Sequence, residues 1–146
     1  QEEGGLIGSR AYVKSLQSSG LLSQVVADIN VEMTGYDSDN NGALHVIDCD
    51  RAESVPFASE VMNAIAALQL PLQKSPACTD RSDHASFWNV KRPAIVVSQD
   101  FFGGDGNPCY HKMCDQVDKL NFTYMANVTK ALASATASVL GAAEVP

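Results

Sequence analysis

Apolar positions along the chain recur with two different periods, and the shorter period predicts strands. Residues 24–33 and 93–98 are rich in β-branched residues, which is typical of buried strands. A polar turn at residues 37–42 ends in Asn41-Gly42, a pair that favours a two-residue β-hairpin. Residues 43–47 are therefore predicted to form the returning strand of that hairpin.

Three other segments carry apolar residues at helical spacing. The first is predicted to begin with Ser9 as its cap and to stop at Gly20. The second opens at Pro56, and the third is capped by Asn121 and ends near Gly141. Residues 101–114 are predicted to form a long loop. Strands that alternate with helices in this way predict a layered α/β fold.

Composition narrows the class of protein. The chain has 146 residues, of which 45% are hydrophobic and 18% charged, so it can bury a core as one domain. A formal net charge of −7 argues against a nucleic-acid partner, because phosphate binding needs a basic surface. No apolar run approaches the roughly 20 residues of a membrane span, so we expect no membrane partner.

The four cysteines favour an oxidising compartment without fixing their pairing. Cys109 and Cys114 lie close together in a Gly, Asn and Pro-rich segment, where a short bridge would pin an irregular loop. Cys49 and Cys78 would then pair with each other, although four cysteines allow three pairings. Two glycosylation triplets, at Asn121 and Asn127, add to the expectation of an exported protein.

Two acidic features are candidates for chemistry. Glu2-Glu3 precedes two glycines, and it is either a solvated acidic turn or a pair in which one carboxylate binds a metal and the other accepts a proton from water. Glu32 ends a hydrophobic strand. It is either an exposed strand end or a ligand at the strand's carboxyl end, where ligands gather in α/β sheets.

Two histidine motifs have competing interpretations. His111 follows Tyr110 inside the Cys109–Cys114 segment, with Asp115 close behind, and this setting suits a metal ligand. A structural zinc knot is disfavoured because the spacing matches no usual one. Asp83-His84 suggests a serine hydrolase, but the chain lacks the Gly-x-Ser-x-Gly nucleophile motif, so we set that interpretation aside.

A calcium-loop spacing occupies the predicted hairpin turn. Asp37, Asp39, Asn41 and finally Asp48 follow the order of EF-hand ligands, with Asp in place of the last Glu. An EF-hand needs flanking helices, whereas the flanks here are predicted strands. The hairpin is therefore preferred, with calcium in the Asp37-Asp39-Asn41 turn as a secondary expectation.

Four segments occur in one order along nearly the whole chain. They are Glu2-Glu-Gly-Gly-Leu-Ile-Gly-Ser, Asn30-Val-Glu-Met-Thr-Gly-Tyr, Ser82-Asp-His-Ala-Ser-Phe-Trp-Asn followed by Pro-Ala-Ile, and Asn107-Pro-Cys-Tyr-His-Lys-Met-Cys-Asp. This order resembles the co-catalytic zinc aminopeptidases of the bacterial leucyl aminopeptidase type, which include secreted fungal and streptomycete enzymes.

The resemblance implies a role for each matching residue. Glu2 matches the general base, and Glu3 and His111 match two ligands of one zinc ion. Glu32 matches a ligand of the second zinc. That ligand is usually Asp in the family, so the side chain of Glu32 is one methylene group longer. Other matches concern the surroundings: a hydrophobic substrate pocket at Met33, Phe102 and Tyr110, residues beside the active site that support the ligands (Asp83, His84 and Asp115), and a disulfide between Cys109 and Cys114.

The resemblance also implies that part of the site lies elsewhere. The family's two-zinc site needs a His and a bridging Asp from sequence upstream of the Glu-Glu motif, where this chain starts. We therefore expect residues 1–146 to be the carboxyl-terminal portion of one catalytic domain, a three-layer α/β/α sandwich around a mixed, mostly parallel sheet. The upstream half would be its partner.

The expected function is that of a secreted zinc enzyme releasing N-terminal, hydrophobic residues from peptides. Zinc ions acidify water and polarise the scissile carbonyl, and a free carboxylate then moves the proton. One alternative is a non-catalytic binding or receptor-like domain that has lost its metals. Another is a zinc carboxypeptidase or amidohydrolase, because the sequence does not place the charged end of the substrate.

Overall fold

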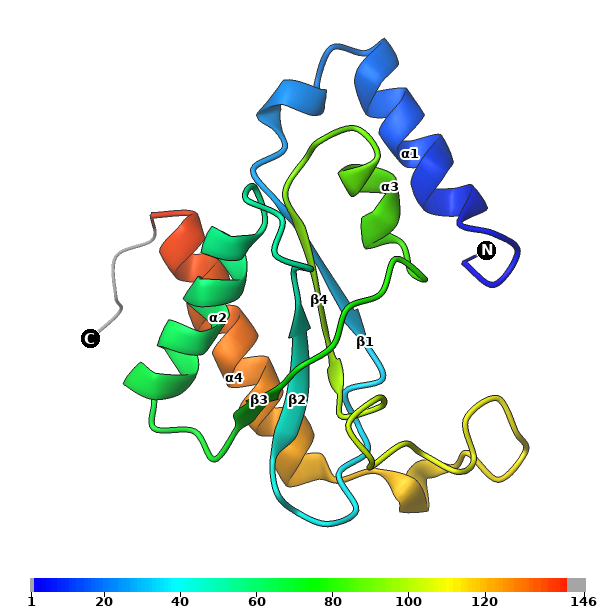
Figure 1. Ribbon diagram of the computed structural model, residues 1–146, viewed down its shortest axis with the longest axis vertical. Coiled ribbons are helices and arrows are strands. Elements are labelled where there is room, and N and C mark those ends of the chain that lie inside the picture. Colours follow the sequence, from blue (N-terminus) through cyan, green and yellow to red (C-terminus); the bar gives the residue numbers. More distant parts are fainter. Residues whose placement is uncertain (1, 142–146) are drawn as a thin grey trace.

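A mixed four-stranded sheet of order β1-β4-β2-β3 organises the computed structural model, which describes residues 2–141 (Figure 1). The strands are β1 (Asp28–Glu32), β2 (Ala43–Ile47), β3 (Gln73–Ser75) and β4 (Ala94–Gln99). The helices are α1 (Ile7–Ser18), α2 (Val55–Ala67), α3 (His84–Trp88) and α4 (Phe122–Val139), with short 3-10 turns η1 (Leu22–Gln24) and η2 (Val117–Lys119). Strands β1 and β4 run parallel, as do β2 and β3, whereas β2 and β4 are antiparallel.

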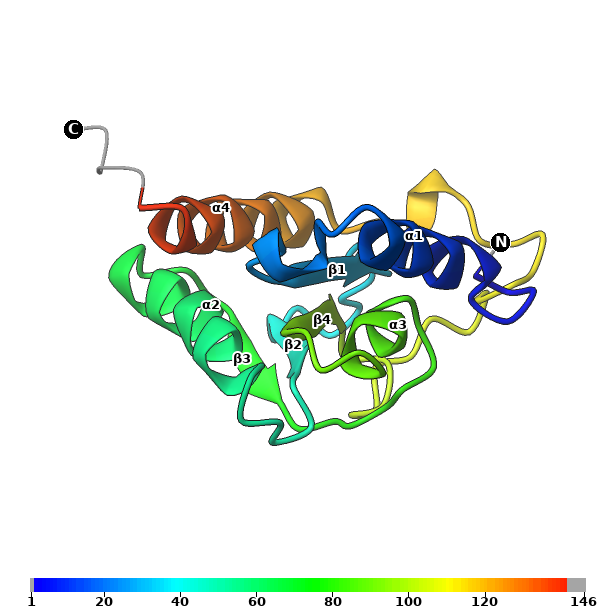
Figure 2. The same ribbon diagram turned by 90° about the horizontal axis from the view of Figure 1, so that it is seen from above.

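Helices cover both faces of the sheet, which confirms the predicted α/β/α layers (Figure 2). Successive side chains of a strand point to opposite faces. In β4, Ile95 and Val97 pack with residues of α2 and α4, whereas Ala94 and Val96 pack with residues of α1 and α3. Every residue of β4 is buried, so this strand serves two hydrophobic cores at once.

The predicted β-hairpin is wrong, because β4 lies between the two strands that it would join. Residues 33–42 instead cross the end of β4 and lead into β2, which pairs with β4 on the side away from β1. The Asn41-Gly42 pair has another use here: Gly42 has a φ of +69°, and a side chain there would collide with the Pro71 carbonyl. The returning strand itself is confirmed at Ala43–Ile47.

Local details at the amino-terminal end also differ from the prediction. Helix α1 begins at Ile7, so Ser9 lies inside its first turn and hydrogen-bonds Ser86 at 2.8 Å between hydroxyls instead of capping. The strand predicted at residues 24–33 covers only β1, at one edge of the described sheet, where Val31 is 48% exposed. The sequence patterns missed β3 and α3 because both elements are short.

The predicted closing helix is confirmed, together with its cap. Asn121 Oδ1 accepts a hydrogen bond of 3.0 Å from the Tyr124 amide at the start of α4. The Asn121 amide group also donates to the Asp37 carboxylate at 3.1 Å, which ties α4 to the turn that precedes β2. No helix among residues 2–141 combines the length and the apolar character of a membrane span.

Two disulfides hold irregular segments to this framework. Cys49 pairs with Cys78, and Cys109 pairs with Cys114, which is one of the pairings the sequence left open. The first joins the end of β2 to the segment before α3. The second closes a small loop between β4 and η2.

A carboxyl group at the start of β1 is buried at an energetic cost. Asp28 Oδ2 is buried and has no hydrogen-bond partner among the described residues. Burial, and secondarily the charge of Asp83, raise the pKa of Asp28 from 3.8 to about 6. The folded chain therefore holds this proton more tightly than the unfolded chain, and the resulting stability is lost as the pH rises through about 6.

Replacing Asp28 by Asn is expected to stabilise the chain at pH 8 but not at pH 3.5. The shift corresponds to an upper bound of about 3 kcal/mol, which solvent screening of a partly exposed group reduces to about 1–2 kcal/mol. Urea unfolding followed by Trp88 fluorescence measures the effect, with the exposed Asp50→Asn as control. An equal effect of Asp28→Asn at both pH values would contradict the assignment.

Candidate functional site

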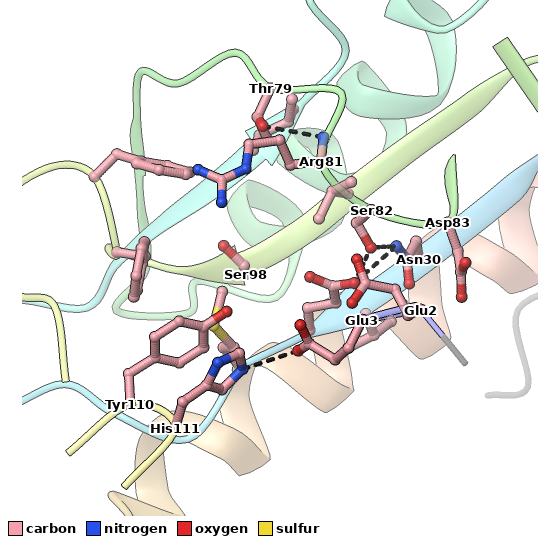
Figure 3. Close-up of a pocket in the computed structure, with 17 residues that line it drawn as sticks. Glu2, Glu3, Asn30, Thr79, Arg81, Ser82, Asp83, Ser98, Tyr110 and His111 are labelled. Carbon is pink, nitrogen blue, oxygen red and sulfur yellow. Dashed lines mark hydrogen bonds and ion pairs between the residues drawn. The ribbon is translucent and has the colours of Figure 1, made fainter. Parts of the chain in front are cut away.

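A pocket of about 480 Å³ opens at the carboxyl ends of β1 and β4, on the face that α1 and α3 cover (Figure 3). This is the sheet position where α/β proteins bind ligands. Four separate segments reach it: the amino-terminal turn, the end of β1, the segment before α3, and the loop after β4. The pocket brings together all of the predicted catalytic and metal-binding residues, Glu2, Glu3, Glu32 and His111.

Glu3 and His111 form the most direct contact between these distant segments. His111 Nε2 lies 2.9 Å from Glu3 Oε1, and both side chains are largely solvent-exposed. His111 has a φ of +57°, in the left-handed region, which is uncommon for residues other than glycine but which His adopts more readily than most. The Cys109–Cys114 disulfide brackets this residue and acts as a covalent clamp on its backbone.

Glu32 is held by two polar side chains. Asn30 Nδ2 donates to Glu32 Oε1 at 3.2 Å and to Ser82 Oγ at 2.7 Å, and Ser82 Oγ also hydrogen-bonds Glu32 Oε1. Asn30 precedes Glu32 by two residues on β1, so both point to the same face of the sheet. This network fixes Oε1 of Glu32, whereas no hydrogen bond within residues 2–141 engages Oε2 of this pocket-lining residue.

Negative charge accumulates on the floor of the pocket. Burial first, and then the charges of Glu3, Glu32 and Asp83, raise the pKa of Glu2 above its ordinary value. The same cluster acts on Tyr110, whose pKa is raised by burial and by Glu3, Glu2 and Glu32. Acidic groups that crowd together in this way favour a bound cation or a bound proton.

The other wall of the pocket is apolar and aromatic. Met33, Phe102 and Tyr110, the predicted substrate-pocket residues, all line the cavity, and Phe101 joins them. The Phe101 ring packs edge-on against Tyr110 with 4.9 Å between ring centroids. Tyr110 in turn stacks on His111 at 3.9 Å.

The three predicted supporting residues occupy different places. Asp83 lines the pocket, and its Oδ1 is buried without a partner among the described residues. His84 is fully buried outside the pocket: its Nε2 lies 2.9 Å from the Thr79 carbonyl, its ring packs edge-on against Trp88, and burial lowers its pKa. Asp115 accepts a hydrogen bond of 2.9 Å from Asn107, so it braces the His111 loop from outside the pocket.

The acidic turn at residues 37–42 contributes to a separate cluster, none of whose members lines the pocket. Carboxylate oxygens of Asp37, Asp39 and Asp105 lie within 4.8 Å of one another. Asp105, which the sequence pattern did not include, accepts hydrogen bonds from the amide and hydroxyl of Ser38. Asp48, the last position of the calcium-loop pattern, instead pairs with Lys74 at 3.7 Å. Calcium binding in this turn stays a prediction.

The donor set of the main pocket suits a zinc ion. Two carboxylates and an imidazole, from Glu3, Glu32 and His111, are ligand types that zinc prefers. Glu3 and His111 are close enough to bind one ion together. Among residues 2–141, however, the only three such side chains with ligand atoms within 4.8 Å of one another are Asp37, Asp39 and Asp105, so Glu32 stands apart from the Glu3–His111 pair. Burial first, and then the neighbouring carboxylates, raise the pKa of Glu2, and a positive ion in the pocket would offset the repulsion between those carboxylates.

Several pocket residues escaped the sequence analysis. Ser82 and Asn30 contact Glu32, and Arg81 brings a guanidinium group to the pocket at the opposite end from the His111–Glu3 pair (Figure 3). The spacing of Asn30 and Glu32 on one strand was a usable signal. No sequence signal indicated Arg81, because only the tertiary structure places its segment at the pocket.

Comparison of the sequence with known proteins gives a consistent result. Residues 1–136 match Peptidase family M28. A protein named "Probable leucine aminopeptidase" from Arthroderma benhamiae is 30% identical over 130 residues, which cover 88% of this chain and 34% of that protein. "Leupeptin-inactivating enzyme 1" from Streptomyces exfoliatus is 30% identical over 149 residues, covering 92% of this chain and 32% of the enzyme. The chain thus spans about a third of the length of these relatives.

Solved structures share the fold. The LapA aminopeptidase of Legionella pneumophila superposes with a TM-score of 0.78 at 29% identity, covering 100% of this chain and 38% of LapA. BSAP, a zinc aminopeptidase from Bacillus subtilis, gives a TM-score of 0.82 at 21% identity and covers 94% of this chain and 33% of its own. At that identity the likeness to BSAP concerns the fold alone.

Replacing Cys109 and Cys114 by Ser is expected to free His111 while leaving the fold intact. The loop is short, so chain entropy predicts a loss of only about 2 kcal/mol, against roughly 3.5 kcal/mol for Cys49 and Cys78. Nuclear magnetic resonance of the His111 ring reports its pairing with Glu3, and urea unfolding reports stability. The Cys49→Ser/Cys78→Ser variant is the control, and an unchanged His111 ring signal in the loop variant would contradict the clamp.

Proposed function

The chain belongs to peptidase family M28, and from that premise we propose that residues 1–146 form the carboxyl-terminal portion of a zinc aminopeptidase's catalytic domain. The convergence of Glu3, Glu32 and His111 with Glu2 in one pocket is the observation that carries this proposal. These four residues come from three separate segments of the chain. Carboxylates that gather around one pocket favour a bound cation there.

The complete site would hold two zinc ions. Glu3 and His111 would bind one of them and Glu32 the other, while a His and a bridging Asp from an upstream half of the same domain would complete the set. Asn30 and Ser82 leave one oxygen of Glu32 available to the pocket, which supports this division. The upstream half has a place to join, because β1 is an edge strand of the described sheet.

Proton transfer is the task that we assign to Glu2. Zinc, when bound, supplies the positive charge that acidifies water and polarises the scissile carbonyl. Glu2 does not pair with His111, and its raised pKa lies closer to neutrality than that of an ordinary carboxylate. It would accept a proton from the attacking water and pass it to the departing amine.

The aromatic wall supports a preference for hydrophobic N-terminal residues. Met33, Phe101, Phe102 and Tyr110 offer an apolar surface beside the carboxylates. Acidic residues beside that surface would bind the positively charged amino terminus of a peptide, which favours an aminopeptidase over a carboxypeptidase or amidohydrolase. Two disulfides support secretion. A metal-free binding domain on the same scaffold remains the alternative from another class.

Zinc content and turnover of aminoacyl-anilides test the proposal together. The experiment uses this chain and a version extended upstream with its natural sequence. We expect two zinc ions and hydrolysis of leucyl-p-nitroanilide in the extended protein only, both lost on treatment with a chelator and restored by zinc. Absence of zinc and turnover in both proteins would instead support a binding domain.

Replacing Glu2 by Gln tests the role of the general base without removing a proposed zinc ligand. In the extended enzyme we expect the turnover number to fall by at least roughly 10²- to 10⁴-fold, because the proton acceptor is lost. Zinc content should be unchanged, since Glu2 binds no metal in this scheme. Glu53→Gln, which removes a similar charge outside the pocket, is the control. A Glu2→Gln enzyme that kept most of its turnover would overturn the assignment.

A further inference from the structure

His45 is a buried ring with both nitrogens committed to backbone groups. It lies on β2 and is completely inaccessible to solvent. Its Nδ1 is 3.0 Å from the Ser75 carbonyl, and its Nε2 is 2.9 Å from the Phe102 amide nitrogen. A carbonyl only accepts and an amide only donates, so Nδ1 carries the proton and Nε2 accepts. The neutral ring therefore bridges β3 and the loop that follows β4.

We propose that His45 is a positioning residue that sets the hydrophobic wall of the substrate pocket by holding Phe102. The inference rests on the proposed aminopeptidase function, because it concerns the wall that would receive the first side chain of a peptide. His45 itself does not line the pocket, whereas Phe102 does. Phe102 is 53% exposed, so its ring has little surrounding protein to fix it.

A chain of ring-to-ring contacts connects His45 to the aromatic residues that line the pocket. His45 lies 5.6 Å from Phe102, Phe102 lies 5.1 Å from Phe101, and Phe101 lies 4.9 Å from Tyr110, measured between ring centroids. Tyr110 stacks on His111 at 3.9 Å. Aromatic pairs at these separations attract each other. A displacement of Phe102 would therefore be felt along the apolar wall, at Phe101 and Tyr110.

Within residues 2–141, His45 is the side chain that accepts the Phe102 amide, and the neighbouring Asp100 does not take this role. Asp100 Oδ1 lies 3.6 Å from His45 Nε2, yet it has no hydrogen-bond partner among residues 2–141. A side chain at Gly103 would collide with the Asp100 carboxylate, so the loop backbone packs directly against this group. Among the described residues, the His45 nitrogen is the acceptor of the Phe102 amide.

The position of His45 in the sheet explains why a histidine suits this role. Ser98 of β4 has Glu32 of β1 on one side and His45 of β2 on the other. Cross-strand neighbours share a face, so the ring lies on the face of the sheet that carries Glu32. From there it reaches the loop after β4 without entering the pocket.

Two variants of His45 each keep one of its two hydrogen bonds and lose the other. Asn is expected to place an amide near Nδ1 and keep the Ser75 contact, but it has no atom at the position of Nε2. Gln reaches that position with Oε1 and can still accept from the Phe102 amide. Ser54→Ala is the control, because buried Ser54 Oγ also accepts a backbone amide, from Ala94 at 3.2 Å, away from the pocket.

Hydrogen exchange of the Phe102 amide in this chain is the first measurement. We expect exchange to be about two- to tenfold faster in His45→Asn, since the amide loses its one hydrogen-bond acceptor among the described residues. His45→Gln and Ser54→Ala should stay close to the unsubstituted chain at Phe102. Equal exchange in His45→Asn and His45→Gln would overturn the proposal.

Substrate selectivity of the upstream-extended enzyme is the second measurement. In His45→Asn we expect KM for leucyl-p-nitroanilide to rise severalfold with little change for alanyl-p-nitroanilide, and His45→Gln should restore the ratio. An equal loss for both substrates, or the same change in Ser54→Ala, would overturn the proposal. Absence of hydrolysis in the unsubstituted enzyme would refute the proposed function, and the Phe102 exchange would still decide whether His45 holds the wall.

Discussion

The burial of β4 on both faces is the constraint on which the rest of the structure depends. Its side chains contribute alternately to two hydrophobic cores, so the strand has to occupy the centre of the sheet. That requirement separates β1 from β2 and sends the intervening turn across the end of the sheet. It also places Glu32, Ser98 and His45 side by side on three neighbouring strands. Two of these residues, Glu32 and Ser98, line the pocket.

Electrostatics and covalent links then give the pocket its character. Burial, and then the charges of Glu3, Glu32 and Asp83, raise the pKa of Glu2, so carboxylates from the amino-terminal turn and from β1 repel one another here. Hydrogen bonds from Asn30 and Ser82 fix one of these carboxylates, while a disulfide holds the left-handed His111 opposite Glu3. The aromatic rings lie on the other side. An acidic end and an apolar, aromatic end thus share one cavity.

The sequence was informative wherever a signal is local. Helical spacing and the Asn121 cap located α4, and β-branched runs located β4. The motif residues Glu2, Glu3, Glu32 and His111 were identified because their types and order resemble those of a known family, and the structure brings them into one pocket. The Asn41-Gly42 pair led to the wrong prediction of a hairpin. A glycine is required at position 42 because the backbone lies close to the Pro71 carbonyl, and a tight hairpin turn would require a glycine there as well.

By itself, the sequence determined the α/β class, most of the elements, the chemical types at the site and membership of the family. Only the tertiary structure decided the strand order, the choice among the three cysteine pairings, and the contacts of Asn30, Ser82 and His45. The physical reason is that propensity and capping act over a few residues. Sheet order and a pocket's polar contacts instead depend on which distant segments bury surface against each other. His45 shows this most clearly, since its two partners lie 30 and 57 residues away.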